Sequence, residues 1–241
     1  MLNIMRQKEQ LLLKLKNQNE QLNDYAHLVS HDLKSSLRSL SALLSWVKED
    51  CSEKIGEESI CNLNLMEEKI EKMDQFLEDI INYSEIGGTS LKINTIDLNV
   101  KVNKIIESLD IPKNINVVIK GKLPVLKADA RRLRQVFQNL ISNAVNFNDK
   151  EVGLVEIGVE ETEGFYTFSI KDFGQGIPKE YHEKIFNTFT TLGYHEKSTG
   201  MGLSIVKRVL DLYGGEIWLE SEVLKGSTFY FTLPKNKANE A

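Results

Sequence analysis

The feature that most restricts the fold is the make-up of the first 86 residues, which contain no proline and a single glycine, Gly56. Proline ends helices and glycine weakens them, so a stretch this poor in both favours long helices. Apolar residues recur there every three or four positions, the spacing of a helix that buries one face. A polar stretch at residues 49–58 interrupts this spacing. The sequence therefore predicts two amphipathic helices joined by a turn, a helical hairpin.

The apolar positions suggest how the hairpin is covered. Residues 1–22 fit a coiled-coil linker whose seam contains Lys8 and Gln18 as polar positions. Residues 23–86 carry two stripes: Leu33, Leu37, Leu40, Leu44 and Val47, then Ile60, Leu63, Met66, Ile70, Met73, Leu77 and Ile80. Two helices alone leave an apolar face uncovered, so we expect a homodimer in which two copies form a four-helix bundle. A helical spacer without chemistry would show the same periodicity.

The pattern changes after a predicted hinge at residues 87–90, Gly-Gly-Thr-Ser. Alternating, β-rich segments predict strands at 91–96, 115–119, 154–159, 165–171, 217–221 and 228–233. Helical spacing predicts helices at 98–109, 130–148 and 200–213. Helices packed on a mainly antiparallel or mixed sheet give an α+β fold, with an α/β sandwich over residues 91–236 and a short tail at 237–241.

Composition limits the classes of function. The chain is 41% hydrophobic and 27% charged, which is ordinary for a soluble protein. Its net charge of −5 argues against a nucleic-acid partner. Cys51 and Cys61 lack the spacing of a redox or zinc site, and the longest aliphatic run, residues 11–13, is far too short to span a bilayer. We therefore expect a cytoplasmic core, with any sensor domain or membrane anchor outside this sequence.

Three clusters in the second region carry polar chemistry. Asn139 and Asn143 lie four apart on one helix face, and an amide oxygen suits Mg²⁺. Asp172-x-Gly174-x-Gly176 follows a strand; an ionised Asp can accept a hydrogen bond from the amine of adenine, and glycines let the backbone approach a ring. Each pattern alone also fits a solvated helix face or a plain β-turn.

The third cluster is the run 198–203, Ser-Thr-Gly-Met-Gly-Leu, directly before a helix. A glycine-rich turn that leads into a helix offers free N–H groups for phosphate. About two dozen residues with little regular pattern precede it, and we interpret them as a mobile lid over a nucleotide. Thr228, at the start of the last predicted strand, is placed to hydrogen-bond near the ring.

Four motifs in this order closely resemble the N, G1, F and G2 boxes of histidine kinases: Asn139-x-x-x-Asn143, Asp172-x-Gly174-x-Gly176, Phe186-x-x-Phe189 and Gly200-x-Gly202-Leu203. Their ATP-binding domain has the Bergerat fold, which gyrase, mismatch-repair and heat-shock ATPases share. The resemblance implies that ATP and Mg²⁺ are the cofactors and that Asn143 holds the metal. The nucleotide-binding candidates are Asn139, Asn143, Phe147, Asp172, Gly174, Gly176, Gly200, Gly202, Leu203 and Thr228.

One residue separates the members of that superfamily. The hydrolysing members have Glu where Asn139 stands, and Asn has no basic carboxylate with which to activate water. The γ-phosphoryl group is then preserved for another acceptor. The run His31-Asp32-Leu33-Lys34-Ser35 resembles the H-box of the dimerisation and phosphotransfer domain. His31 lies about 200° around the helix from Val29 and Leu33, so it faces away from the apolar stripe.

The resemblance assigns roles around His31. It implies that Asp32 holds and deprotonates the imidazole, and that Ser35 orients water for dephosphorylation of a response regulator, whose Asp receives the phosphoryl group. Neutral imidazole is a competent nucleophile at pH 7. His27, one turn earlier, is interpreted as a solvated residue.

The chain departs from the family pattern at three positions. Ser36 stands where a kinking proline is usual, Asn146 where Lys is common, and Thr191 where an Arg is often found. Two lost cations would weaken stabilisation of the γ-phosphate, although Lys184 or Lys197 could replace them. A slow or phosphatase-dominant histidine kinase and a non-catalytic, nucleotide-gated scaffold therefore both stay open. A serine kinase of the same superfamily is disfavoured because those proteins lack the hairpin.

Overall fold

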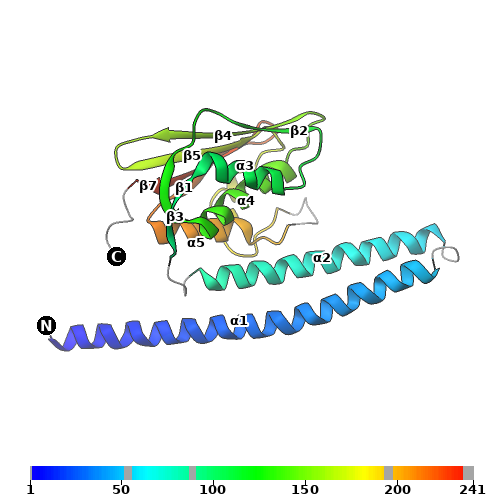
Figure 1. Cartoon of the computed structure of the whole chain (residues 1–241), viewed down its shortest axis with the longest axis horizontal. Coiled ribbons are helices and arrows are strands. Elements are labelled where there is room, and N and C mark those ends of the chain that lie inside the picture. The colour runs from blue at the N-terminus through cyan, green and yellow to red at the C-terminus, as the bar shows by residue number, and fades with distance from the viewer. Residues whose placement is uncertain (1, 52–55, 87–90, 193–197, 236–241) are drawn as a thin grey trace. The chain divides into compact units, whose positions relative to one another are not determined.

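The computed structural model describes residues 2–51, 56–86, 91–192 and 198–235. The chain divides into a helical unit within residues 1–89 and an α+β unit that contains most of the remainder. The predicted hairpin is confirmed: α1 (Leu2–Cys51) and α2 (Glu57–Glu85) run side by side (Figure 1). The predicted hinge at 87–90 and the tail at 237–241 lie outside the described residues.

Helix α1 continues without a break from the predicted linker into the hairpin, bending gently along its length (Figure 1). Most side chains of the predicted seam in residues 1–22 lie outside the description, so the coiled coil stays a prediction. In the hairpin Leu37, Leu44 and Leu77 are buried. Two ion pairs join the helices, Lys34–Glu78 at 2.5 Å and Lys48–Glu67 at 2.6 Å. Each is partly exposed and contributes little on its own.

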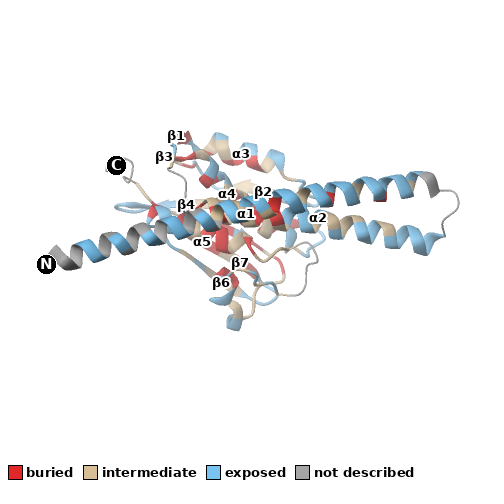
Figure 2. Cartoon of the chain, turned by 90° about the horizontal axis from the view of Figure 1, so that it is seen from below, coloured by how far each residue is buried: buried red, intermediate tan, exposed pale blue. Residues whose placement is uncertain are grey.

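Much of the hairpin is exposed (pale blue in Figure 2), and several of its exposed residues are large and apolar. On α1 the exposed members of the stripe, Leu33, Leu40 and Val47, are seven residues apart, and on α2 Met66 and Met73 share that spacing. The apolar stripe therefore has two parts. One part packs between the two helices, and the other, an exposed row, is not covered by any other part of the same chain among the described residues. No helix in the described part of the chain has the length and apolar character that crossing a bilayer requires.

The α+β unit is built on a five-stranded mixed sheet, as expected. The order is β2 (Ile115–Ile119), β4 (Gly153–Glu161), β5 (Phe165–Asp172), β7 (Gly226–Pro234) and β6 (Ile217–Glu222). Strands β2 and β4 are parallel, and the other neighbours are antiparallel. A second, two-stranded sheet pairs β1 (Ile93–Asp97) with β3 (Val125–Asp129).

Three helices lie on one face of the large sheet: α3 (Leu98–Ser108), α4 (Ala130–Asn146) and α5 (Gly202–Tyr213) (Figure 1). Asp97 caps α3 and Asp129 caps α4, each accepting from two main-chain N–H groups of the helix's first turn. Phe137 of α4 meets Phe168 and Phe231 of the sheet edge-on, with ring centroids 5.5 and 5.4 Å apart. This aromatic cluster fixes α4 against β5 and β7, the strands that support the candidate site.

Most predicted elements are present with ends shifted by one or two residues, and two of the differences have clear reasons. Helix α5 begins at Gly202 and not at residue 200, because Gly200 has a φ of 72°, in the left-handed region. Strand β3 was not expected: it is only five residues long and forms by pairing with β1, about 30 residues earlier in the chain. Short strands of that kind depend on a distant partner and leave a weak local pattern.

Candidate functional site

Helix α4 forms one wall of the candidate nucleotide site. Asn139 and Asn143 lie one turn apart on the same side of α4, and both are half-buried. Asn139 Nδ2 donates to the Gln135 carbonyl at 2.9 Å. A Cβ added to Gly202 would lie 2.9 Å from Asn139 Oδ1, so the start of α5 lies directly against this asparagine.

Asn143 has a different environment. Its side chain makes no hydrogen bond to another residue in the described ranges, although it is half-buried. An amide oxygen in that position can take up an oxygen-seeking cation such as Mg²⁺. Asn146, the last residue of α4, is exposed, and its Nδ2 donates to Ser142 Oγ at 3.2 Å. It supplies no positive charge to the site.

Asp172 ends β5 and is only 4% exposed. Its Oδ1 accepts hydrogen bonds from the main-chain N–H groups of Gly174, at 2.9 Å, and Ser227, at 3.2 Å. Burial raises the pKa of Asp172 to about 6, opposed by these two N–H donors and aided by the negative charge of Asp149. The other oxygen, Oδ2, accepts from neither donor, so it is available to an amine of a ligand.

The glycines after Asp172 are required by close contacts. A Cβ on Gly174 would overlap the carbonyl oxygen of Phe147, which caps α4. Gly176 has a φ of 70°, and a Cβ there would overlap the Glu222 carbonyl. The loop after β5 is thus pressed against the C-terminal end of α4 on one side and the β6–β7 turn on the other.

These contacts bring the predicted residues together along α4. Asn139, Asn143 and Phe147 are spaced by one turn each, and the rise of a helix puts the first and last about 12 Å apart. The start of α5 lies at the Asn139 end and the Asp172 loop at the Phe147 end. The site can therefore hold a ligand with a hydrogen-bonding base at one end and anionic groups at the other.

The start of α5 suits an anion. Among the described residues no side chain forms an N-cap hydrogen bond at the start of α5, whose first turn carries the positive end of the helix dipole. Leu203, in the first turn, is half-buried. A Cβ on Gly200 would lie 2.8 Å from the carbonyl carbon of Phe189, whose own φ is 63°. Phe189, which lies within the predicted lid, is therefore against the backbone of Gly200, while residues 193–197, which include Lys197, lie outside the description. Lys184 lies over the Tyr181 ring, 5.7 Å from its centroid.

Thr228, which was expected to hydrogen-bond near the ring, lies opposite Lys171 and on the other face of the sheet from Asp172. Burial alternates along β7: residues 227, 229 and 231 face the helices, and residues 228 and 230 face the opposite side. Ser227 is thus the residue next to Asp172. Neighbouring side chains of a strand point to opposite faces, so choosing Thr228 and not its neighbour Ser227 put the candidate on the other face of the sheet. Gly226 and Ser227 were missed as site residues.

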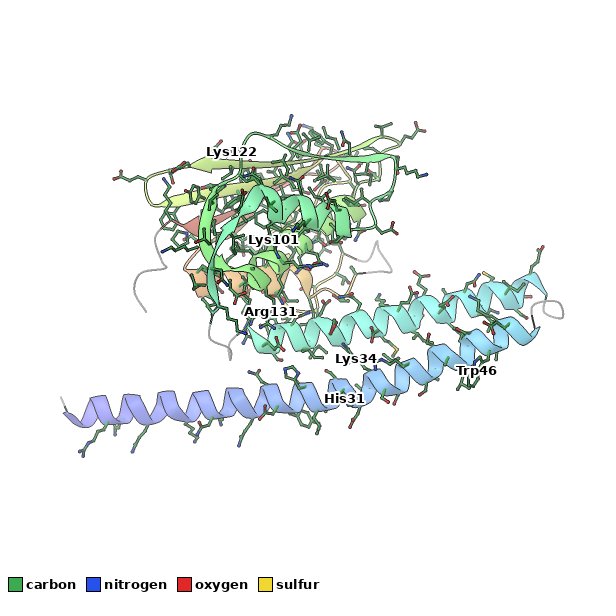
Figure 3. All side chains as sticks on the ribbon, in the orientation of Figure 1. His31, Lys34, Trp46, Lys101, Lys122 and Arg131 are labelled. Carbon is green, nitrogen blue, oxygen red and sulfur yellow. The ribbon has the colours of Figure 1, made fainter. Side chains whose placement is uncertain are left out.

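The candidate phosphoacceptor is on the hairpin, in the middle of α1 (Figure 3). The side chain of His31 is 84% exposed, as its predicted orientation requires, and its Nδ1 lies 3.4 Å from Asp32 Oδ1. When Nδ1 carries the ring proton and donates a hydrogen bond to Asp32, Nε2 is unprotonated and its lone pair points toward solvent. Ser35 is exposed one turn later, on the same face.

Two neighbours of His31 show interactions that the sequence did not indicate. His27 is not simply solvated: its Nε2 lies 3.5 Å from Glu85 Oε1, near the end of α2. Ser36, at the position of the usual proline, donates its hydroxyl to the Asp32 carbonyl at 3.2 Å. This is the common i−4 bond of a helical serine, and the helix continues here because serine, unlike proline, keeps its main-chain N–H.

Comparison with known proteins shows which family the chain resembles. Residues 128–237 match the family model described as histidine kinase-, DNA gyrase B- and HSP90-like ATPase. The chain is 34% identical to cyanobacterial phytochrome B of Nostoc sp., over 93% of this chain and 31% of that protein. It is 30% identical to the adaptive-response sensory kinase SasA of Prochlorococcus marinus, over 96% and 62%. The chain thus spans about a third of the length of the phytochromes it matches.

Solved structures give the same result. The catalytic domain of histidine kinase ThkA is 31% identical, with a TM-score of 0.52, covering 60% of this chain and 96% of that domain. Full-length ShkA in complex with AMPPNP has a TM-score of 0.66 at 23% identity, covering 88% of this chain and 45% of that protein. The likeness to ShkA extends the shared fold to the hairpin.

Proposed function

Because the chain belongs to the histidine kinases, we propose that it transfers the γ-phosphoryl group of ATP to His31 and then to an Asp of a response regulator. The observation that best supports this is the arrangement along α4, where Asn139 and Asn143 lie between the start of α5 and the Asp172 loop. Asp172 would accept a hydrogen bond from the adenine amine. The first turn of α5 would bind the phosphates.

The proposed transfer step uses the arrangement at His31. The Nε2 lone pair attacks the γ-phosphorus, an N–P bond forms, and the bond to the bridging β–γ oxygen breaks, so that ADP leaves with the electron pair. Asp32, 3.4 Å from Nδ1, stabilises the positive charge that develops on the ring and accepts the Nδ1 proton. Asn139 cannot activate water, so the phosphoryl group is not lost to hydrolysis at this point.

Asn143 would hold Mg²⁺, which when bound neutralises charge on the phosphates. We expect Asn143→Asp to weaken Mg-ATP binding at least tenfold, because it places another negative charge beside the phosphates and changes the metal's ligand set. Calorimetric titration with Mg-ATP measures this, with Asn103→Asp, the same exchange at an exposed position of α3, as the matched control. Equal affinities for Asn143→Asp and the wild type would show that the metal site is elsewhere.

The exposed apolar row of the hairpin predicts a homodimer. Histidine kinases generally act as dimers, and burying Leu33, Leu40 and Val47 against a second copy would remove a large apolar patch from water. Light scattering should give twice the mass of the chain at micromolar concentration. Leu40→Glu should shift the population to monomer, whereas Val100→Glu, an exposed apolar residue of α3, should not. A monomeric wild type would contradict the dimer.

Ser35→Ala should separate two activities. Autophosphorylation should change less than threefold, because this hydroxyl is one turn from His31 and is not the nucleophile. Dephosphorylation of the phosphorylated response regulator should slow about tenfold or more, since Ser35 would orient the attacking water. Both rates can be followed with labelled phosphate and the cognate receiver domain. Loss of autophosphorylation with normal dephosphorylation would show that the role proposed for Ser35 is wrong.

A further inference from the structure

Ser221, near the end of β6, joins the segments that surround Asp172. Its Oγ accepts from the Ile177 N–H at 2.7 Å, donates to the Gly226 carbonyl at 3.1 Å and lies 2.9 Å from Ser227 Oγ. A serine hydroxyl has one donor and two acceptor positions. These contacts use all three when Ser227 is the donor in the last of them.

The partners of Ser221 belong to the two pieces of chain that hold the Asp172 carboxylate. Ile177 ends the glycine loop whose Gly174 N–H binds Oδ1, and Ser227 supplies the other N–H to the same oxygen. The loop has a second bond to the β6–β7 turn, from Leu224 N–H to the Gln175 carbonyl at 2.7 Å. Strands β6 and β7 lie side by side, so Ser221 bridges the loop to the start of β7 (Figure 2).

We propose that Ser221 is a positioning residue of the nucleotide site, which fixes the two N–H donors that orient Asp172 toward the base. The proposal rests on the adenine-binding role given to Asp172 above. Ser221 acts through its hydroxyl, which holds the loop and β7 at the spacing that lets both N–H groups reach Oδ1. Its role is specific to the base end of the nucleotide.

Two consequences are expected if the Gly174 and Ser227 N–H groups are no longer held in place. Adenine presents an amine to Asp172, whereas guanine has a carbonyl oxygen at that position, so a correctly held carboxylate favours ATP over GTP. The N–H bonds also favour the ionised form of Asp172, against burial and the charge of Asp149, the charged group that acts on it from another segment. Without Ser221 the carboxyl should be protonated at higher pH, so ATP binding should be lost at higher pH.

The test compares Ser221→Ala, Ser221→Thr and Ser221→Cys with the wild-type chain, and uses Ser169→Ala in β5 as the matched control. Calorimetric titrations with Mg-ATP and Mg-GTP are run from pH 5 to 8. We expect Ser221→Ala to lower the ATP-to-GTP preference about tenfold and to raise the pH midpoint of ATP binding. Thr keeps the hydroxyl, so Ser221→Thr should show an ATP-to-GTP preference within about threefold of the wild type and a pH midpoint close to that of the wild type. Cys keeps the size with a weaker donor and should give intermediate values.

A purely structural serine would give a different result. Ser221→Ala would then lower the melting temperature but leave the ATP-to-GTP preference and the pH midpoint unchanged, and this outcome would overturn the proposal. If Ser221→Ala does not fold, an unchanged preference and midpoint in Ser221→Cys would overturn it equally. A wild type that fails to prefer ATP would instead contradict the nucleotide site itself, so the two failures are distinguishable.

Discussion

Replacing Asp172 by asparagine is expected to abolish ATP binding at micromolar concentrations, with a loss in affinity of about 100-fold or more. The introduced side-chain amide would keep an oxygen for the Gly174 and Ser227 N–H groups, as the carboxylate does now. Its NH₂ group would then face the ligand and meet the adenine amine, donor against donor. Two buried donors that face each other without an acceptor cost more binding free energy than the simple loss of one hydrogen bond.

The same variant should be more stable than the wild type above pH 6. The pKa of Asp172 is raised from 3.8 to about 6. Between those values the folded protein keeps a proton that the unfolded chain has lost, so stability falls as pH rises through this range. The difference corresponds to roughly 3 kcal/mol as an upper bound, or a gain of several degrees in melting temperature for Asp172→Asn at pH 8. The gain should vanish near pH 4.

Thermal melting and nucleotide titration across pH 4–8 measure both effects. Asp149→Asn is the matched control, since it makes the same exchange at the exposed residue whose charge raises the pKa of Asp172. It should leave ATP affinity at pH 8 within about threefold of the wild type. Wild-type ATP affinity should itself fall as pH drops below about 6, while the residual binding of Asp172→Asn stays flat. Near-normal ATP affinity in Asp172→Asn would contradict the adenine site.

Replacing His31 by glutamine should reduce phosphoryl incorporation from ATP to background while leaving ATP affinity unchanged. Glutamine retains polarity and helix propensity but has no nucleophilic nitrogen. His27→Gln is the matched control, because this second histidine lies one turn away on the same helix, yet is paired with Glu85 at 3.5 Å. The control should keep most of the activity. Label that persists in His31→Gln would show that another residue is the acceptor.

Most of the site could be predicted because its parts are local in sequence. The asparagines of α4, the Asp172 turn and the glycines before α5 each show their chemistry within a few neighbouring residues. Helix periodicity also fixed the side of α1 on which His31 lies, and its 84% exposure agrees. These features depend on spacing along one element, which the residues themselves display.

The parts that could not be predicted depend on contacts between distant segments. The Ser227 N–H reaches Asp172 across 55 positions of the chain, and a main-chain donor has no signature in the side-chain pattern. Glu85 meets His27 only because the hairpin brings the last residue of α2 against the middle of α1. Ser221 looks like an ordinary strand residue until β6 and β7 pair beside the glycine loop. Such contacts require the fold to be known.

The most direct test of the account is to incubate the wild-type chain with γ-labelled Mg-ATP and to identify the labelled bond. We predict a phosphoramidate that is labile to acid and comparatively stable to base, located in the peptide that contains His31. Acid-stable label would indicate a phosphoester on Ser, Thr or Tyr and would contradict the account. Tight ATP binding with no label at all would contradict it as well, and would indicate a nucleotide-gated scaffold without kinase activity.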